Sequence, residues 1–140
     1  MDYATQEASF AIPNGFADLT LNRLVYKRPT GDLQVVVART AAQGRSLDEA
    51  VELRLRDQQR GIPYFEIVDR SARQVAGRAA IDTRVTFVER ERKQYQRSGS
   101  ILVEKNVVVV AVMGPMEIRE EVDATFESAL ASLAFRDKGD

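Results

Sequence analysis

The sequence predicts an α+β fold in which two main helices pack on an antiparallel twisted sheet. Three observations lead to this class. Runs rich in β-branched residues are separated by turn signals, two segments repeat apolar residues at helical spacing, and the order along the chain is strands, helix, strands, helix. Because short turns join most of the strands, we expect mainly antiparallel pairing and an α/β sandwich.

Three extended segments precede the first helix. Ala8 to Ile12 reads as a short strand that ends at a Pro-Asn-Gly turn. Leu19 to Lys27 is the next extended run, and a turn with Pro29 and Gly31 leads into Leu33 to Arg39. The density of β-branched residues in that last run is typical of a buried strand.

The first helix is predicted from Leu47 to Arg60. Ser46 and Glu49 form a capping box, in which hydroxyl and carboxylate satisfy each other's free backbone N–H groups. Apolar residues fall on one face, and Gly61 followed by Pro63 ends the helix.

Four strands and a second helix complete the chain. The strands are expected at Tyr64–Asp69, Arg78–Glu89, Gln94–Val103 and Val107–Met113. In the Arg78–Glu89 strand, polar Asp82, Arg84 and Thr86 alternate with apolar residues, so one of its faces should be wetter. Helical spacing returns after Gly114-Pro115, at Ile118, Val122, Phe126, Leu130 and Leu133.

Composition favours one soluble, cytoplasmic domain spanning residues 1–140. The length suits a single core, and the net charge of −1 provides no general attraction to nucleic acid or an anionic membrane. The first seven residues have no basic or apolar character of a signal peptide. The longest apolar run, Val107 to Met113, is too short to cross a bilayer.

The residue types needed for most catalysis are missing. The chain has no histidine and no cysteine, which removes the usual proton shuttle, thiol nucleophile and commonest metal ligands. No phosphate-binding glycine loop or nucleophile elbow occurs. We therefore expect a binding protein with no cofactor and no metal, and keep a hydrolase with two paired carboxylates as a remote alternative.

A basic stretch on the later strands allows two interpretations. It could be a nucleic-acid patch, or it could be a solvated hairpin tip, as the interleaved Glu89 and Glu91 favour. Its members are Arg90, Arg92, Lys93 and Arg97, with Tyr95 among them.

Polar residues interrupt the apolar arc of the first helix. At about 100° per residue, Arg54 and Gln58 project into the same arc as Val51 and Leu55. Either this end of the helix overhangs the sheet and stays wet, or the two side chains belong to a mixed groove that receives another chain. The Leu19–Lys27 strand likewise offers apolar groups, including Leu21 and Leu24, on both faces.

A series of short motifs runs along nearly the whole chain. The motifs are Glu7–Pro13, Thr20–Asn22, Lys27–Pro29, Ala38–Gly44, Ile62–Phe65, Val75–Ala80 and the closing segment Phe126–Leu133. Their order and spacing resemble those of the DcrB-like domain family, although each motif is short.

The resemblance implies a PsbP-like fold and a homodimer. Members without a signal peptide include the Eag chaperones of type VI secretion systems, whose concave surface shelters the apolar N-terminal transmembrane helices of an effector before export. The chain resembles these more than the secreted lipoprotein branch. Candidate partner-binding residues on this basis are Leu21, Arg23, Leu24, Arg54, Gln58, Ile62, Tyr95 and Gly99.

Three candidate positions depart from the family pattern. Members favour apolar residues where this chain has Arg23 and Gln58, and glutamine where it has Arg54. The expected function is a dimeric chaperone or adaptor for the apolar N-terminal segment of an effector. The alternative is a PsbP-like module that binds a folded partner through charge, using Arg90, Arg92 and Arg97.

Overall fold

The computed structural model describes residues 20–26 and 31–133. The elements of this part of the chain, in order, are β1 (Thr20–Tyr26), β2 (Leu33–Ala41), α2 (Leu47–Gly61), β3 (Glu66–Val75), β4 (Arg78–Glu89), β5 (Arg92–Val103), β6 (Asn106–Pro115), the short 3-10 turn η1 (Met116–Ile118) and α3 (Arg119–Ala131). The strand expected at Ala8–Ile12 lies outside the described residues.

The described strands form one six-stranded sheet. Their order across the sheet is β1-β2-β6-β5-β4-β3, and every neighbouring pair is antiparallel. From β3 to β6 the chain runs as a meander, in which each strand turns back beside the one before it. The predicted antiparallel sheet is confirmed. The strand expected at Tyr64–Asp69 is observed at Glu66–Val75, so it continues six residues past its expected end.

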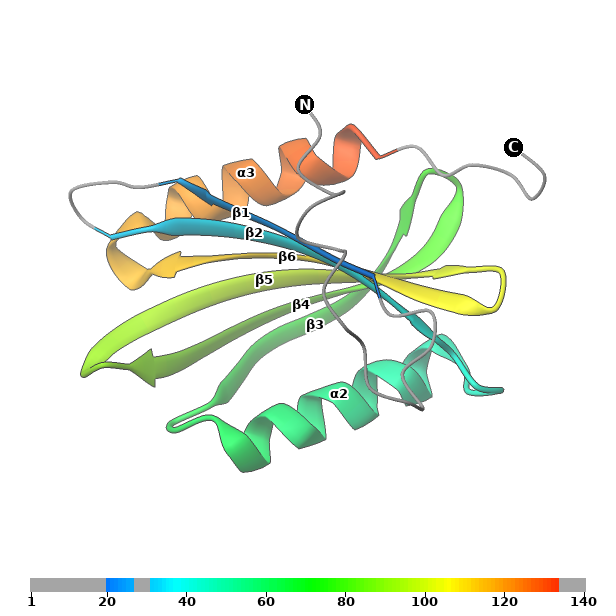
Figure 1. Ribbon diagram of the computed structural model, residues 1–140, viewed down its shortest axis with the longest axis horizontal. Coiled ribbons are helices and arrows are strands. Elements are labelled where there is room, and N and C mark those ends of the chain that lie inside the picture. Colours follow the sequence, from blue (N-terminus) through cyan, green and yellow to red (C-terminus); the bar gives the residue numbers. More distant parts are fainter. Residues whose placement is uncertain (1–19, 27–30, 134–140) are drawn as a thin grey trace.

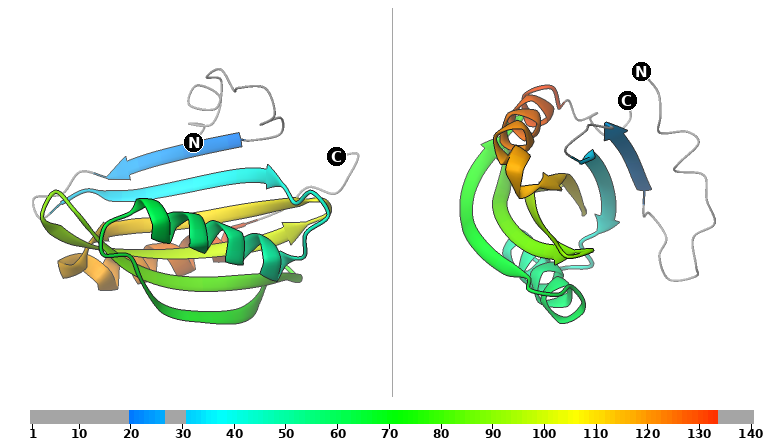
Figure 2. Two further views of the ribbon diagram at one scale, coloured as in Figure 1. Left: turned by 90° about the horizontal axis from the view of Figure 1, so that it is seen from below. Right: turned by 90° about the vertical axis from the view of Figure 1, so that its left-hand side faces the viewer.

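The two helices cover opposite faces of the sheet. Figure 1 shows three layers, with α3 above the strands and α2 below them. The left view of Figure 2 looks onto α2 with the sheet behind it, and the right view shows the sheet curved around the α3 side. Since successive side chains of a strand point to opposite faces, each of the central strands contributes to both layers.

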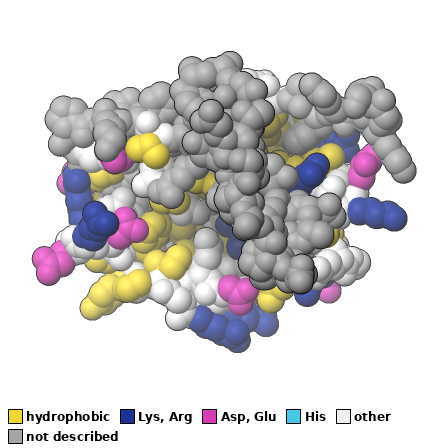
Figure 3. Space-filling model, in the orientation of Figure 1, with side chains coloured by type: hydrophobic (Ala, Val, Ile, Leu, Met, Phe, Trp, Pro, Cys, Tyr) yellow, Lys and Arg dark blue, Asp and Glu magenta, His cyan; other side chains and the backbone are white. Residues whose placement is uncertain are grey.

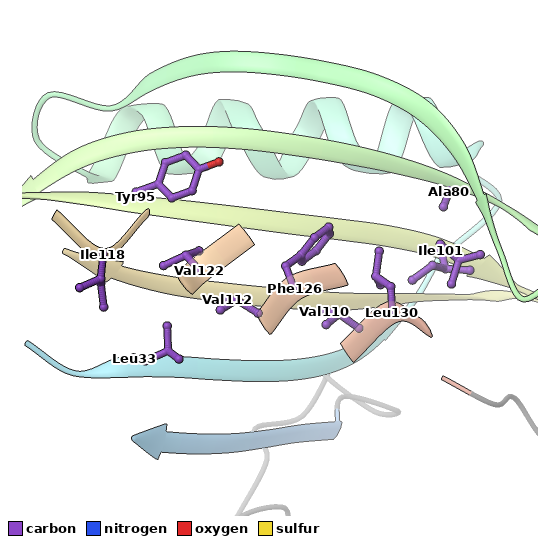
Figure 4. Packing of buried hydrophobic residues seen from close by; sticks show 11 residues of the cluster. Leu33, Ala80, Tyr95, Ile101, Val110, Val112, Ile118, Val122, Phe126 and Leu130 are labelled. Carbon is purple, nitrogen blue, oxygen red and sulfur yellow. The ribbon is translucent and has the colours of Figure 1, made fainter. Parts of the chain in front are cut away.

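The α3 side holds one half of the core. Val122, Phe126 and Leu130 lie along one face of α3 and are almost fully buried against the sheet. Figure 4 shows them pointing toward strand residues that include Ile101 and Val112. The helical spacing seen in the sequence therefore predicts this interface correctly.

The α2 side holds the other half. The capping box forms, with the Glu49 backbone N donating to Ser46 Oγ at 3.1 Å and the Ser46 backbone N donating to Glu49 Oε1 at 2.9 Å. Leu47, Val51 and Leu55 are buried beneath the helix. The predicted start and apolar face of this helix are confirmed.

The expected wet face of β4 is wrong. Asp82 is 6% exposed and Thr86 is 4% exposed. Both faces of this strand are buried, because α3 and its neighbours cover the side opposite to α2. The polar alternation in β4 therefore marks a buried ionic cluster rather than a solvated surface.

Arg97 of β5 is the centre of that cluster. Its guanidinium is 3% exposed, pairs with Asp82, and contacts Asp123 Oδ1 at 3.3 Å and Glu127 Oε2 at 3.0 Å. It also lies over the ring of Phe126, 4.3 Å from the centroid. Although burial opposes it, these carboxylates raise the pKa of Arg97 above its ordinary value. The cluster ties α3 to two adjacent strands of the sheet.

Gly99 lies beneath α3 and gives that helix room to approach. It pairs with Asp82 across the β4–β5 ladder and with Val110 across the β5–β6 ladder. A Cβ at this position would meet the Phe126 ring at 3.2 Å. Gly99 is therefore a packing residue of the core.

We expect Gly99→Val to lower the free energy of unfolding by about 1–3 kcal/mol, because the added side chain overpacks the contact with Phe126. Gly61→Ala is the matched control, since nothing lies within 4 Å of its Cβ position. Urea unfolding measures both variants. A Gly99→Val protein as stable as the wild type would contradict the close packing of α3.

Candidate partner-binding site

A pocket of about 490 Å³ opens between α2 and the sheet. This volume lies in the range of pockets that hold a ligand. Its walls come from β2, β5, β6, the β2–α2 connection and one flank of α2. The lining residues are Thr40, Ala41, Ala42, Gln43, Arg45, Ala50, Val51, Leu53, Arg54, Asp57, Gln58, Ser100, Val107 and Val109. We call this pocket the α2 groove.

Much of the α2 groove is apolar. Val107 and Val109 enter from β6, and Ala50, Val51 and Leu53 enter from the helix. Leu53 remains 39% exposed, so the groove presents a large apolar side chain to solvent. Such a surface favours contact with apolar groups of another molecule.

Arg54 and Gln58 form the polar wall of the groove. They are four residues apart on α2, so they are stacked on the same flank of the helix. Both are half-buried. The groove interpretation of the mixed helical arc is therefore favoured over a wet, overhanging helix end.

Half-buried Arg54 has no counter-charge among the described residues. Nη2 donates to Ser100 Oγ at 3.3 Å, and no carboxylate of the described residues lies within ion-pair distance of its guanidinium. Burial lowers the pKa of Arg54 from its ordinary value to about 10. The side chain is still cationic at neutral pH, in a place where nothing in the described part of the chain neutralises it.

Gln58 adds an unused acceptor to the same wall. Its Oε1 atom is buried and accepts no hydrogen bond from the part of the chain that the structure describes. Burying such an atom without a partner costs about 1–3 kcal/mol. The groove thus combines an apolar surface with unsatisfied hydrogen-bonding groups.

The structure separates the other predicted site residues into three places. Tyr95 and Gly99 lie on the α3 side, across the sheet from Arg54. Tyr95 is 5% exposed and donates to Asp123 Oδ1 at 2.7 Å. Burial, together with that carboxylate, raises its pKa to about 12. These two residues do not share a surface with the α2 groove.

Ile62 caps the C-terminal end of α2 and packs against the α2-side core. It directly follows the helix that flanks the groove but does not line the groove.

The predicted β1 positions divide between the two faces of the sheet. Leu21 pairs with Ala38, which pairs with Val109, a residue of the groove. The register position of Arg23 belongs to the same face. Leu24 pairs with Val35, which packs against the α3-side core, so its position belongs to the other face.

Sequence reasoning missed several groove residues. Ser100, Val107 and Val109 come from strands far from α2 in the sequence, and only the strand order brings them to the groove. Thr40 lies at the end of β2, just before α2. For Ser100 a signal exists, since it is the polar neighbour of Gly99 and alternation places the two on opposite faces.

The basic stretch does not form a basic surface. Arg97 is buried among carboxylates, and Arg92 Nη2 pairs with Glu117 Oε2 at 3.3 Å. Arg90 is exposed at the β4–β5 turn, as the hairpin-tip interpretation predicts. That interpretation is wrong for Tyr95 and Arg97. On the face drawn in Figure 3, positive and negative side chains are interspersed.

Within residues 20–26 and 31–133, no three acidic side chains come together in an arrangement that could hold a metal ion. No helix in this part of the chain is long and apolar enough to cross a membrane.

The sequence matches the DcrB family model over residues 7–132. The chain belongs to the DcrB family. No curated protein sequence matches it. Among solved structures, this DcrB-family chain is similar to PA94 of Pseudomonas aeruginosa, a protein of unknown function, with a TM-score of 0.77 and 20% identity over 97% of this chain and 96% of that one.

Two further structures share the fold of this DcrB-family protein. LpqN of Mycobacterium tuberculosis, which is involved in cell envelope biogenesis, gives a TM-score of 0.58 at 10% identity, covering 84% of this chain and 76% of LpqN. The cyanobacterial PsbP protein of Synechocystis sp. PCC 6803 gives 0.51 at 13% identity, covering 88% and 77%. The predicted PsbP-like fold is confirmed.

We expect Arg54→Met to raise the free energy of unfolding of this DcrB-family protein by about 1–3 kcal/mol at pH 7, because it removes a buried charge without a counter-charge. The unfolded chain holds the Arg54 proton more tightly than the folded chain does. The difference in the free energy of unfolding between Arg54→Met and the wild type should therefore shrink as the pH rises through 10.

Arg97→Met is the matched control, and its free energy of unfolding should fall by about 3–5 kcal/mol, because it removes the buried partner of Asp82 and leaves that carboxylate only the contact with Arg73 at 3.1 Å. Urea unfolding at pH 7 and at pH 10.5 compares the three proteins. A loss of stability in Arg54→Met would mean that the guanidinium is compensated within the fold.

Proposed function

We propose that this DcrB-family chain is a non-catalytic effector chaperone or adaptor of a type VI secretion system. In this proposal the α2 groove binds and shields the apolar N-terminal segment of a cognate effector and aids its loading. The protein acts in the cytoplasm as a homodimer, without nucleic acid and without inserting stably into a membrane.

The observation that carries the proposal is the composition of the α2 groove. An apolar segment that packs on side chains such as Leu53 and Val109 removes its hydrocarbon surface from water. This burial stabilises the complex by roughly 25 cal/mol per Å² of apolar area. Arg54 and Gln58 can satisfy polar groups of the same segment. Membership of the DcrB family and the resemblance to Eag chaperones support this choice of partner.

The charge-based alternative has little structural support. It assigned the partner surface to Arg90, Arg92 and Arg97, of which Arg97 is buried and Arg92 is paired with Glu117. We therefore favour the groove over the β4–β5 hairpin as the site of contact.

Co-expression with the effector encoded beside the gene tests the proposal. The complex should co-purify, and truncating the effector's apolar N-terminus should abolish it. Leu53→Glu should weaken binding about tenfold or more, since it places a charge on the apolar wall of the groove. Light scattering should give the free chain twice its monomer mass.

Val68→Glu is the matched control, because Val68 is 59% exposed on β3 and does not line the groove. Its binding should equal that of the wild type. If the truncated effector still forms the complex, the chaperone role is excluded. If both glutamate variants weaken binding equally, the contact surface is not the α2 groove.

A further inference from the structure

Two arginines that are shielded from water differ in the charges that surround them. Arg97, on the α3 side, has three carboxylates within ion-pair distance. Arg54, on the α2 side, has one hydroxyl, that of Ser100, and no carboxylate among the described residues. The same guanidinium group is thus neutralised on one face of the sheet and left unneutralised on the other.

The surroundings of Arg54 leave it available to a partner. It lines the groove beside apolar Val51 and Val109, so its field is poorly screened by water. Asp57 also lines the groove, but it is exposed and does not pair with the guanidinium. Apart from the bond to Ser100 Oγ, the guanidinium of Arg54 makes no hydrogen bond within residues 20–26 and 31–133.

A carboxylate is the group that completes this site. A guanidinium presents parallel N–H donors whose spacing matches the two oxygens of a carboxylate, and such pairs are stronger than neutral hydrogen bonds. The Arg97 cluster shows the same chemistry satisfied from within this chain. A neutral amide in that place would supply one acceptor and no charge.

We infer that the segment received by the α2 groove carries an acidic side chain, whose carboxylate pairs with Arg54. This inference rests on the proposed function, since it specifies the chemistry of the segment that the groove binds. Gln58 Oε1 accepts a hydrogen bond from an N–H or O–H group of the same segment. The partner is therefore an apolar segment with one acid at a fixed position, and purely hydrocarbon segments bind less tightly.

A pair of synthetic peptides tests the inference. Each is an Ala/Leu helix of about 18 residues with neutral solubilising tails, blocked ends and a fluorescent label. One has a central Glu and the other has Gln at the same position. At pH 8 the Glu peptide should bind the wild type about tenfold or more tightly than the Gln peptide, because a charge-assisted pair replaces a neutral contact. Fluorescence anisotropy gives both dissociation constants.

Arg54→Gln should abolish the preference for the Glu peptide, so that its two dissociation constants become nearly equal. Arg45→Gln is the matched control, because Arg45 also lines the groove but is exposed and donates to Gln43 Oε1. It should keep the preference. Loss of the preference in Arg45→Gln as well would point to a diffuse positive field and would overturn the pairing with Arg54.

The outcomes separate this inference from the proposed function. Equal binding of the two peptides by the wild type overturns the inference and leaves the chaperone proposal in place. If neither peptide binds up to the highest concentration at which it stays in solution, the result contradicts both the apolar-segment proposal and the inference.

Discussion

The constraint on which the rest of the structure depends is the burial of Arg97 between the sheet and α3. Its guanidinium has almost no contact with water, so it must be neutralised in place, and residues of β4 and α3 do this. The pairing fixes α3 against the central strands. Gly99 gives the helix room to lie close, and Phe126 packs under the cation. The pocket of about 490 Å³ lies on the opposite face of the sheet, beside α2.

Arg54 has the opposite role on that other side. A buried cation with no counter-charge lowers the stability of the fold, and the lowered pKa of Arg54 reports the same cost. Apolar side chains line the groove next to it. Gln58 Oε1 beside them accepts no hydrogen bond from the described residues. In our proposal, a bound segment that is apolar along its length and anionic at one point complements these features.

Local patterns in the sequence predict much of this fold, because capping, turns and periodicity depend on near neighbours. The capping box at Ser46 and the helical arc containing Arg54 and Gln58 are of this kind. Burial that depends on a distant element is not predictable in the same way. Asp82 and Arg97 look like solvated strand residues until α3, far along the chain, covers them. Gly99 likewise falls beneath α3 only because the strand register puts it there.

The most direct test of the account is the titration of individual arginines by NMR of their guanidinium carbons. Assignment comes from Arg54→Lys and Arg97→Lys variants. The account predicts that the Arg54 signal titrates with a midpoint about 10, while the Arg97 guanidinium, whose pKa is raised, stays protonated throughout the pH range in which Arg54 titrates. If the Arg54 guanidinium stays protonated to the same pH as that of Arg97, its charge is compensated within the chain. That result would contradict the central claim.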